Sequence, residues 1–140
     1  MKCLIYNNQH KSKWDTLSEL LGSKKIPFER VDTLAAAVKT IQEQDISVLV
    51  LDSHIDNMHI DEAIRVFKCL APKLRILVST DRNSKSLETR VRKEQVFYYH
   101  VDMSGLQELE LAITTAWNRC IDENQPLHSG TQESVIRARS

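Results

Sequence analysis

The feature that most constrains the fold of this 140-residue chain is a regular alternation of short apolar runs with segments of helical periodicity. The apolar runs have the length of β-strands, and the segments between them repeat apolar residues every three or four positions, as amphipathic helices do. The third run, residues 46–51, and the fourth, residues 75–78, are apolar at almost every position. Strands of this kind are buried on both faces, which is typical of a parallel sheet covered by helices on both sides.

The predicted order is therefore βαβαβαβαβα, an α/β fold with a doubly wound, five-stranded parallel sheet of the flavodoxin type. The strands are expected at residues 3–6, 28–31, 46–51, 75–78 and 96–101. The helices are expected around the apolar stripes that begin at Trp14, Leu34, Ile60, Leu87 and Leu106. Thr33 is of a residue type that caps helices and is expected to begin the second one.

Charge and cysteine content indicate a soluble, cytoplasmic protein with no direct nucleic-acid or membrane surface. Lysine plus arginine equals aspartate plus glutamate at 19 each, so the net charge is zero with neutral histidine. No apolar run approaches the roughly 18 to 20 residues of a membrane span. Cys3, Cys69 and Cys120 are odd in number, widely spaced and set in apolar surroundings, which favours reduced core thiols in a reducing compartment.

The composition changes near residue 122. Residues 1–122 are predicted to form one domain. Residues 123–140 contain Pro126, Gly130 and many polar side chains, a composition that is typical of a linker. We expect this segment to be a frayed end or the start of a connection to a further domain.

Polar residues stand where the predicted strands end. In an open parallel sheet, ligands bind at the carboxyl ends of the strands, beside the point where the strand order reverses. The residues expected at this edge, in one shallow pocket, are Asn7, Asn8, Asp52, Ser79, Thr80 and His100.

At Asp52 and the turn after it, Asp-Ser-His-Ile-Asp-Asn-Met-His-Ile, the sequence resembles the receiver domain of bacterial two-component response regulators. The likeness extends over most of the predicted domain. It implies that Asp52 accepts a phosphoryl group from a partner histidine kinase and that the hydroxyl of Ser79 binds the transferred group. It also implies that Phe97 is the aromatic residue of the fifth strand that changes rotamer with that hydroxyl.

The sequence departs from the receiver pattern at several positions of the same site. Asn7 and Asn8 stand where receivers have an acidic pair, His100 stands where they have a lysine, and no proline follows Met58. Amides bind Mg²⁺ less well than carboxylates, and an ordinary histidine is mostly neutral at pH 7. The sequence therefore predicts an atypical receiver, or pseudo-receiver, with weak Mg²⁺ binding at most, and leaves phosphorylation of Asp52 open.

Five potential metal ligands lie within ten residues, but they do not favour a metal site. They are Asp52, His54, Asp56, His59 and Asp61. One loop seldom aims five ligands at one point, and His59 and Asp61 flank the expected helix start at Ile60, so they should point in different directions. We expect solvated turn residues and no metal here. The segment after the first strand also lacks the glycines of a nucleotide-binding loop.

The favoured function is a regulatory module, not an enzyme. It would control an output domain, such as a DNA-binding transcription regulator, through homodimer or partner contacts on the fourth helix, fifth strand and fifth helix. The basic residues Arg90, Arg92 and Lys93 would lie on that surface. Two alternatives stay open: a small flavodoxin-like ligand-binding domain or enzyme that uses the strand-end pocket, and a purely structural dimerisation domain.

Overall fold

The computed structural model describes residues 1–7, 12–55 and 58–124 of the chain. Within them, helices and strands alternate in the predicted order. The strands are β1 (Lys2–Tyr6), β2 (Phe28–Val31), β3 (Ile46–Asp52), β4 (Arg75–Thr80) and β5 (Tyr98–Val101). The helices are α1 (Ser12–Ser23), α2 (Leu34–Glu43), α3 (Ile60–Leu70), α4 (Lys85–Lys93) and α5 (Leu106–Asn124), with a short 3₁₀ turn, η1 (Asp102–Ser104), before α5.

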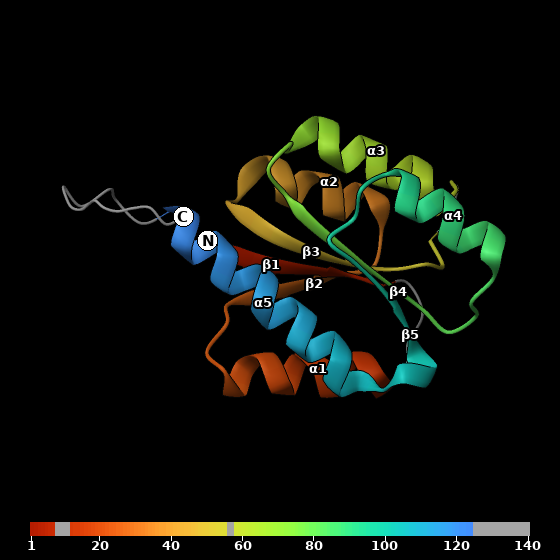
Figure 1. Ribbon diagram of the computed structural model, residues 1–140. Helices are drawn as coiled ribbons and strands as arrows, with labels where there is room; N and C mark the ends of the chain where they lie inside the picture. The colour runs from red at the N-terminus through yellow and green to blue at the C-terminus, as the bar shows by residue number, and fades with distance from the viewer. Residues whose placement is uncertain (8–11, 56–57, 125–140) are drawn as a thin grey trace, which may run out of the picture.

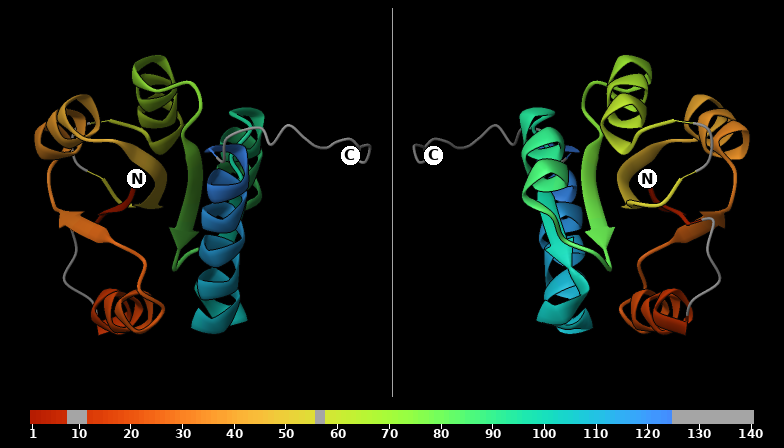
Figure 2. Two further views of the ribbon diagram at one scale, coloured as in Figure 1. Left: turned by 90° about the vertical axis from the view of Figure 1, so that its left-hand side faces the viewer. Right: turned by 90° about the vertical axis from the view of Figure 1, so that its right-hand side faces the viewer.

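All strand pairs in the sheet are parallel, and the spatial order is β2-β1-β3-β4-β5. Helices α1 and α5 cover one face, while α2, α3 and α4 cover the other (Figures 1 and 2). The strand order reverses between β1 and β3, which is where a doubly wound sheet opens a crevice at its carboxyl edge. The predicted fold class, a doubly wound, five-stranded parallel sheet, is confirmed.

Each face of the sheet has its own apolar core, because neighbouring residues of a strand point to opposite sides. On the α1 and α5 side, both tryptophans are buried, Trp14 fully and Trp117 to within 8% of full burial. On the other side, the ring of Phe67 from α3 meets that of Tyr6 edge to face, with ring centroids 6.4 Å apart. Every residue of β3 except Ser47 is buried, as the unbroken apolar run at residues 48–51 predicted for the middle of the strand.

The helix ends follow the expected chemistry in most places. Thr33 caps α2 as predicted, since its hydroxyl accepts a hydrogen bond from the amide of Ala36 at 3.1 Å. Ser84 caps α4 in the same way through the amide of Leu87, at 3.0 Å. After α1 the chain reverses through Lys25, which has a left-handed backbone with φ of 59°.

Several element boundaries and the environment of one cysteine differ from the prediction: β1 begins at Lys2, β3 ends at Asp52 and β4 ends at Thr80, each one or two residues beyond the predicted bound. Strand β5 begins at Tyr98 instead of residue 96, and α5 continues to Asn124, two residues beyond the predicted domain end. Cys3 and Cys120 are buried, but Cys69 is exposed, so the prediction of three core thiols was wrong for Cys69. Cys69 lies on the outer side of α3, because the helix buries the neighbouring Phe67.

The described residues bear only in part on the predicted linker and on the predicted lack of a membrane span. The linker predicted for residues 123–140 lies mostly outside the described residues and stays a prediction. No helix in the described part of the chain combines the length and apolar character needed to cross a membrane.

Candidate functional site

The register of three neighbouring strands brings the predicted site residues together. Asp52 on β3 pairs with Ser79 on β4, and Ser79 pairs with His100 on β5. Residues in register across parallel strands point to the same side of the sheet, so these three side chains face the α1 and α5 layer. Their exposed fractions are 1%, 0% and 1%. Thr80 follows Ser79 and therefore points to the opposite side.

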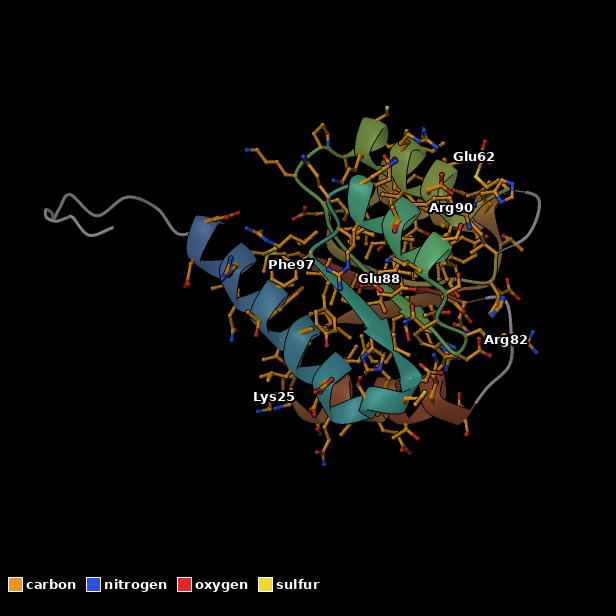
Figure 3. All side chains as sticks on the ribbon, turned by 45° about the vertical axis from the view of Figure 1, so that its right-hand side comes forward. Lys25, Glu62, Arg82, Glu88, Arg90 and Phe97 are labelled. Atoms are coloured by element: carbon orange, nitrogen blue, oxygen red, sulfur yellow. The ribbon has the colours of Figure 1, made fainter. Side chains whose placement is uncertain are left out.

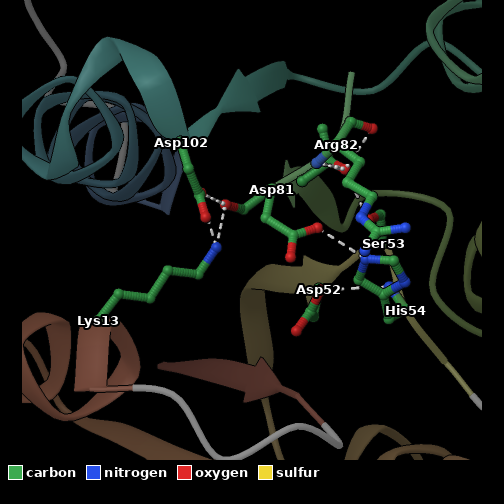
Figure 4. A network of polar contacts seen from close by, with 9 residues as sticks. Lys13, Asp52, Ser53, His54, Asp81, Arg82 and Asp102 are labelled. Atoms are coloured by element: carbon green, nitrogen blue, oxygen red, sulfur yellow. Dashed lines mark hydrogen bonds and ion pairs between the residues drawn. The ribbon is translucent and has the colours of Figure 1, made fainter. Parts of the chain in front are cut away.

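The carboxylate of Asp52 is fixed by the turn that follows β3. Its Oδ1 accepts a hydrogen bond from the amide of His54 at 3.1 Å (Figure 4). The imidazole of His54 lies 2.7 Å from Oδ1 of Asp81, which follows β4. This contact joins the turn after β3 to the turn after β4.

A second link between these turns runs through Thr80. Its hydroxyl accepts a hydrogen bond from the hydroxyl of Ser53 at 2.9 Å and from the amide of Arg82 at 3.1 Å, and donates to the carbonyl of Arg82. Thr80 thus contributes to the structure of the edge, on the side of the sheet opposite to Asp52.

Ser79 belongs to a closed triangle of polar contacts that the sequence did not reveal. Lys13 Nζ, from the first turn of α1, lies 3.0 Å from Ser79 Oγ and 2.7 Å from Asp102 Oδ1. The hydroxyl of Ser79 donates to the same oxygen of Asp102 at 3.1 Å (Figure 4). The positions of Asp102, directly after β5, and of Lys13, shortly after β1, could have indicated that both residues lie at the carboxyl edge of the sheet.

His100 lies beside this triangle and does not act as a second cation. Burial lowers the pKa of its imidazole below the ordinary value, Lys13 lowers it further, and Asp102 and Glu108 only partly oppose these effects. Among the described residues, its buried Nδ1 has no hydrogen-bond partner. A cavity of about 140 Å³ is lined by Lys13, His100, Asp102 and Leu106. Among the described residues that line this cavity, the cation is therefore Lys13 of α1.

The first strand contributes Asn7 to the same edge. Asn7 is 6% exposed, and its backbone N–H donates to the carbonyl of Val31 at 3.1 Å. It follows Tyr6, which pairs with Leu51, so Asn7 lies at the level of Asp52. Asn8 lies outside the described residues.

Potential metal ligands are not clustered in the described part of the chain. Within residues 1–7, 12–55 and 58–124, no group of three or more His, Cys, Asp or Glu side chains is arranged to hold a metal ion. His54 instead contacts Asp81, and Asp61 lies 3.2 Å from the guanidinium of Arg65. The backbone of His59 donates to Glu62 at the start of α3, and Asp56 lies outside the described residues.

The structure does not bring Phe97 to the site. Phe97 precedes β5, its amide donates to the carbonyl of Ile76 near the start of β4, and its ring packs against Arg119 of α5. Figure 3 shows it beside α5, well separated from Arg82 after the end of β4. The aromatic residue of β5 that faces α4 is Tyr99, whose hydroxyl donates to Asn83 Oδ1 at 2.9 Å.

The fold matches those of known signalling domains. The sequence matches no protein-family model and no curated protein. Among solved structures, a CheY-like response regulator receiver domain protein from Methanospirillum hungatei is similar with a TM-score of 0.77 and 15% identity, over 88% of this chain and 98% of that one. The signal receiver domain of an HD domain-containing protein from Pseudomonas fluorescens has a TM-score of 0.76 and 15% identity, over 86% and 97% of the two chains.

A third similar structure is the beryllofluoride-activated NtrC4 receiver domain dimer, with a TM-score of 0.75 and 20% identity, over 84% of this chain and 97% of that one. Because the identities are low, the likeness concerns the fold. The chain has the fold of response-regulator receiver domains, and its Asp52, the last residue of β3, is buried.

Proposed function

We propose that this chain is an atypical receiver domain, a regulatory module that controls a partner or an attached output domain. The observation that carries the proposal is the register of Asp52 and Ser79, which places a carboxylate and a hydroxyl side by side at the carboxyl edge of a receiver fold. Receiver domains of this fold are signalling modules, and the activated NtrC4 receiver domain is described as a dimer.

If the module uses phosphate, Asp52 is the residue that accepts it. A carboxylate oxygen of Asp52 attacks phosphorus of a phosphohistidine or of acetyl phosphate, a new oxygen–phosphorus bond forms, and the bond to the leaving imidazole or acetate breaks. Ser79, which is in register with Asp52, and Lys13, which contacts Ser79, would donate to the transferred oxygens. Asn7 stands where the receiver resemblance implies an acid, and an amide binds Mg²⁺ less well than a carboxylate, so we expect slow and partial phosphorylation.

The surface proposed to pass on the signal consists of α4, β5 and α5. Strand β5 is an edge strand, and beside it Leu111 of α5 is 67% exposed. A shallow pocket of about 340 Å³ is lined by Phe97, Tyr98, Glu108, Leu111, Ala112 and Thr115. Exposed apolar side chains beside an open sheet edge favour a protein contact, either a second copy of the chain or a regulatory partner. Contact with DNA is proposed only through an attached output domain; RcsB from Salmonella enterica, bound to promoter rprA, is a similar structure.

The test is intact-mass spectrometry after incubation with acetyl phosphate and Mg²⁺. We expect the mass of one phosphoryl group to be added to a minor fraction of the protein, and this adduct to be absent in Asp52→Asn. Asp122→Asn, which makes the same change on the exposed end of α5, is the control and should be labelled like the wild type. An adduct that persists in Asp52→Asn would show that Asp52 is not the acceptor.

A second measurement examines the signalling role. Size-exclusion chromatography with light scattering should show that labelling changes the oligomeric state, and that Leu111→Asp abolishes the change. A melting temperature that rises with a nucleotide or flavin, without any labelling, would instead favour a small ligand-binding domain.

A further inference from the structure

The carboxylate of Asp102 makes the contacts that a bound oxyanion would make with Lys13 and Ser79. One oxygen atom, Asp102 Oδ1, receives two donors at once: the ammonium of Lys13 at 2.7 Å and the hydroxyl of Ser79 at 3.1 Å. An ammonium and a hydroxyl that converge on one anionic oxygen are also the donors that phosphate and similar oxyanions use in proteins. The side chain of Asp102 thus occupies a position that a free oxyanion could take.

The side chains of the triangle are largely shielded from water, which strengthens the hydrogen bonds and the ion pair among them. Ser79 is fully buried, and the side chains of Lys13 and Asp102 are 17% and 28% exposed. Charged hydrogen bonds weaken less in such surroundings than on an open surface. Asp102 belongs to the short turn η1, and the chain after it passes through Gly105 at φ of 93° before α5 begins.

The charges near Ser79 disfavour a further anion while Asp102 stays in place. Lys13 is the cation of the triangle, Asp102 is already bound to it, and Asp52 lies beside Ser79 in the sheet. His100 adds no compensating charge at neutral pH, because burial keeps its imidazole neutral. An oxyanion can therefore bind Lys13 and Ser79 only when the carboxylate of Asp102 moves away.

We infer that Lys13 and Ser79 form a binding site for a small tetrahedral oxyanion, and that Asp102 is a built-in competitor that fills it. This inference deepens the proposed function, since the oxyanion is the phosphoryl group when Asp52 is phosphorylated. It also supplies a physical reason for an atypical receiver: the contacts that a phosphoryl group would recruit are already made within the chain. Removal of the Asp102 charge should open the site.

The test measures binding of inorganic phosphate, which requires no covalent step. Phosphate is titrated into the protein at constant ionic strength while backbone amide shifts of residues 79–82 are followed by NMR. Asp102→Asn should bind phosphate roughly tenfold or more tightly than the wild type, the effect expected for regaining charge-assisted hydrogen bonds. Lys13→Met in the Asp102→Asn background should cancel the gain.

Glu108→Gln is the matched control. Glu108 is a carboxylate near His100, whereas the described hydrogen-bond partners of Lys13 are Ser79 and Asp102, so removal of Glu108 changes the net charge equally but frees no donor. It should leave phosphate binding at the wild-type level. Circular dichroism confirms that each variant folds, and Asp102→Ser replaces Asp102→Asn if the latter does not.

Three results would overturn the inference. The affinity for phosphate could rise equally in Asp102→Asn and Glu108→Gln, it could rise in no Asp102 variant, or the rise in Asp102→Asn could persist when Lys13→Met is added. The outcome is separable from that of the proposed function. If Asp102→Asn binds phosphate but acetyl phosphate never labels Asp52, the oxyanion site stands and the acceptor role of Asp52 fails. If wild-type Asp52 is labelled and phosphate binding never improves, the reverse holds.

Discussion

The ion pair between Lys13 and Asp102 should contribute measurably to stability, which a double-mutant cycle can determine. The cycle combines Lys13→Met and Asp102→Asn. At 2.7 Å, an effective dielectric constant of about 20 gives a gross attraction of roughly 6 kcal/mol, most of which is offset by the loss of hydration. Exposed pairs retain about 0.2–1 kcal/mol of coupling, and breaking a fully buried pair costs about 3–5 kcal/mol. With exposed fractions of 17% and 28%, we expect a coupling of about 1–2 kcal/mol.

A second pair on the same chain provides the matched control. Glu88 and Arg92 on α4 lie at the same distance, 2.7 Å, but are 34% and 60% exposed and one helical turn apart. Their coupling should be about 0.3–0.5 kcal/mol. The two cycles therefore differ mainly in burial, since the separation of the charged atoms is equal.

The assay is urea unfolding followed by circular dichroism, with each variant measured at low and moderate salt. The Lys13 and Asp102 coupling should change less with salt than the Glu88 and Arg92 coupling, because water and ions reach the second pair more easily. Equal couplings in the two cycles, or a Lys13 and Asp102 coupling below about 0.3 kcal/mol, would refute the argument that burial strengthens this pair.

Two further predictions concern buried titratable groups. An alkylating reagent should modify the exposed Cys69 in the native protein but reach Cys3 only on unfolding, because burial raises the pKa of the Cys3 thiol to about 12. Peptide mass mapping identifies the modified cysteines. Fast labelling of Cys3 in the native protein would contradict the prediction. Burial lowers the pKa of His100 in the folded chain below the value of about 6.5 in the unfolded chain. The free energy of unfolding should therefore fall as the pH drops below about 6.5, because the unfolded chain binds a proton at His100 at a higher pH than the folded chain does. This stabilisation is complete above that pH, and urea unfolding at several pH values should show a flatter profile for His100→Gln.

Much of the fold was predictable because its signals are local. The continuous apolar sequence of β3 requires burial on both faces, and its alternation with helical stripes implies a parallel sheet. Once the sheet is parallel, the residues that end its strands must lie at one edge, so Asp52, Ser79 and His100 could be placed together. The outcome for Thr80 was also implicit, since consecutive residues of a strand face opposite sides.

Several site features required the tertiary structure. Phe97 was predicted to lie on the fifth strand, but the strand begins one residue later, so Tyr99 is the aromatic residue toward α4. The contact of Lys13 with Asp102 joins residues 89 positions apart, and it depends on how α1 packs beside the turn after β5. Cys69 was predicted to be buried on the apolar character of its neighbours, yet the rotation of α3 turns it outward.

The sequence by itself therefore determined the layers of the fold and the edge of the sheet where the site lies. It could do so because hydrophobic periodicity follows from the geometry of single helices and strands. The tertiary structure decided which charged groups meet at that edge and that Ser79 already contacts Lys13 and Asp102. Such contacts depend on the packing angle and rotation of separate elements, which no local pattern specifies.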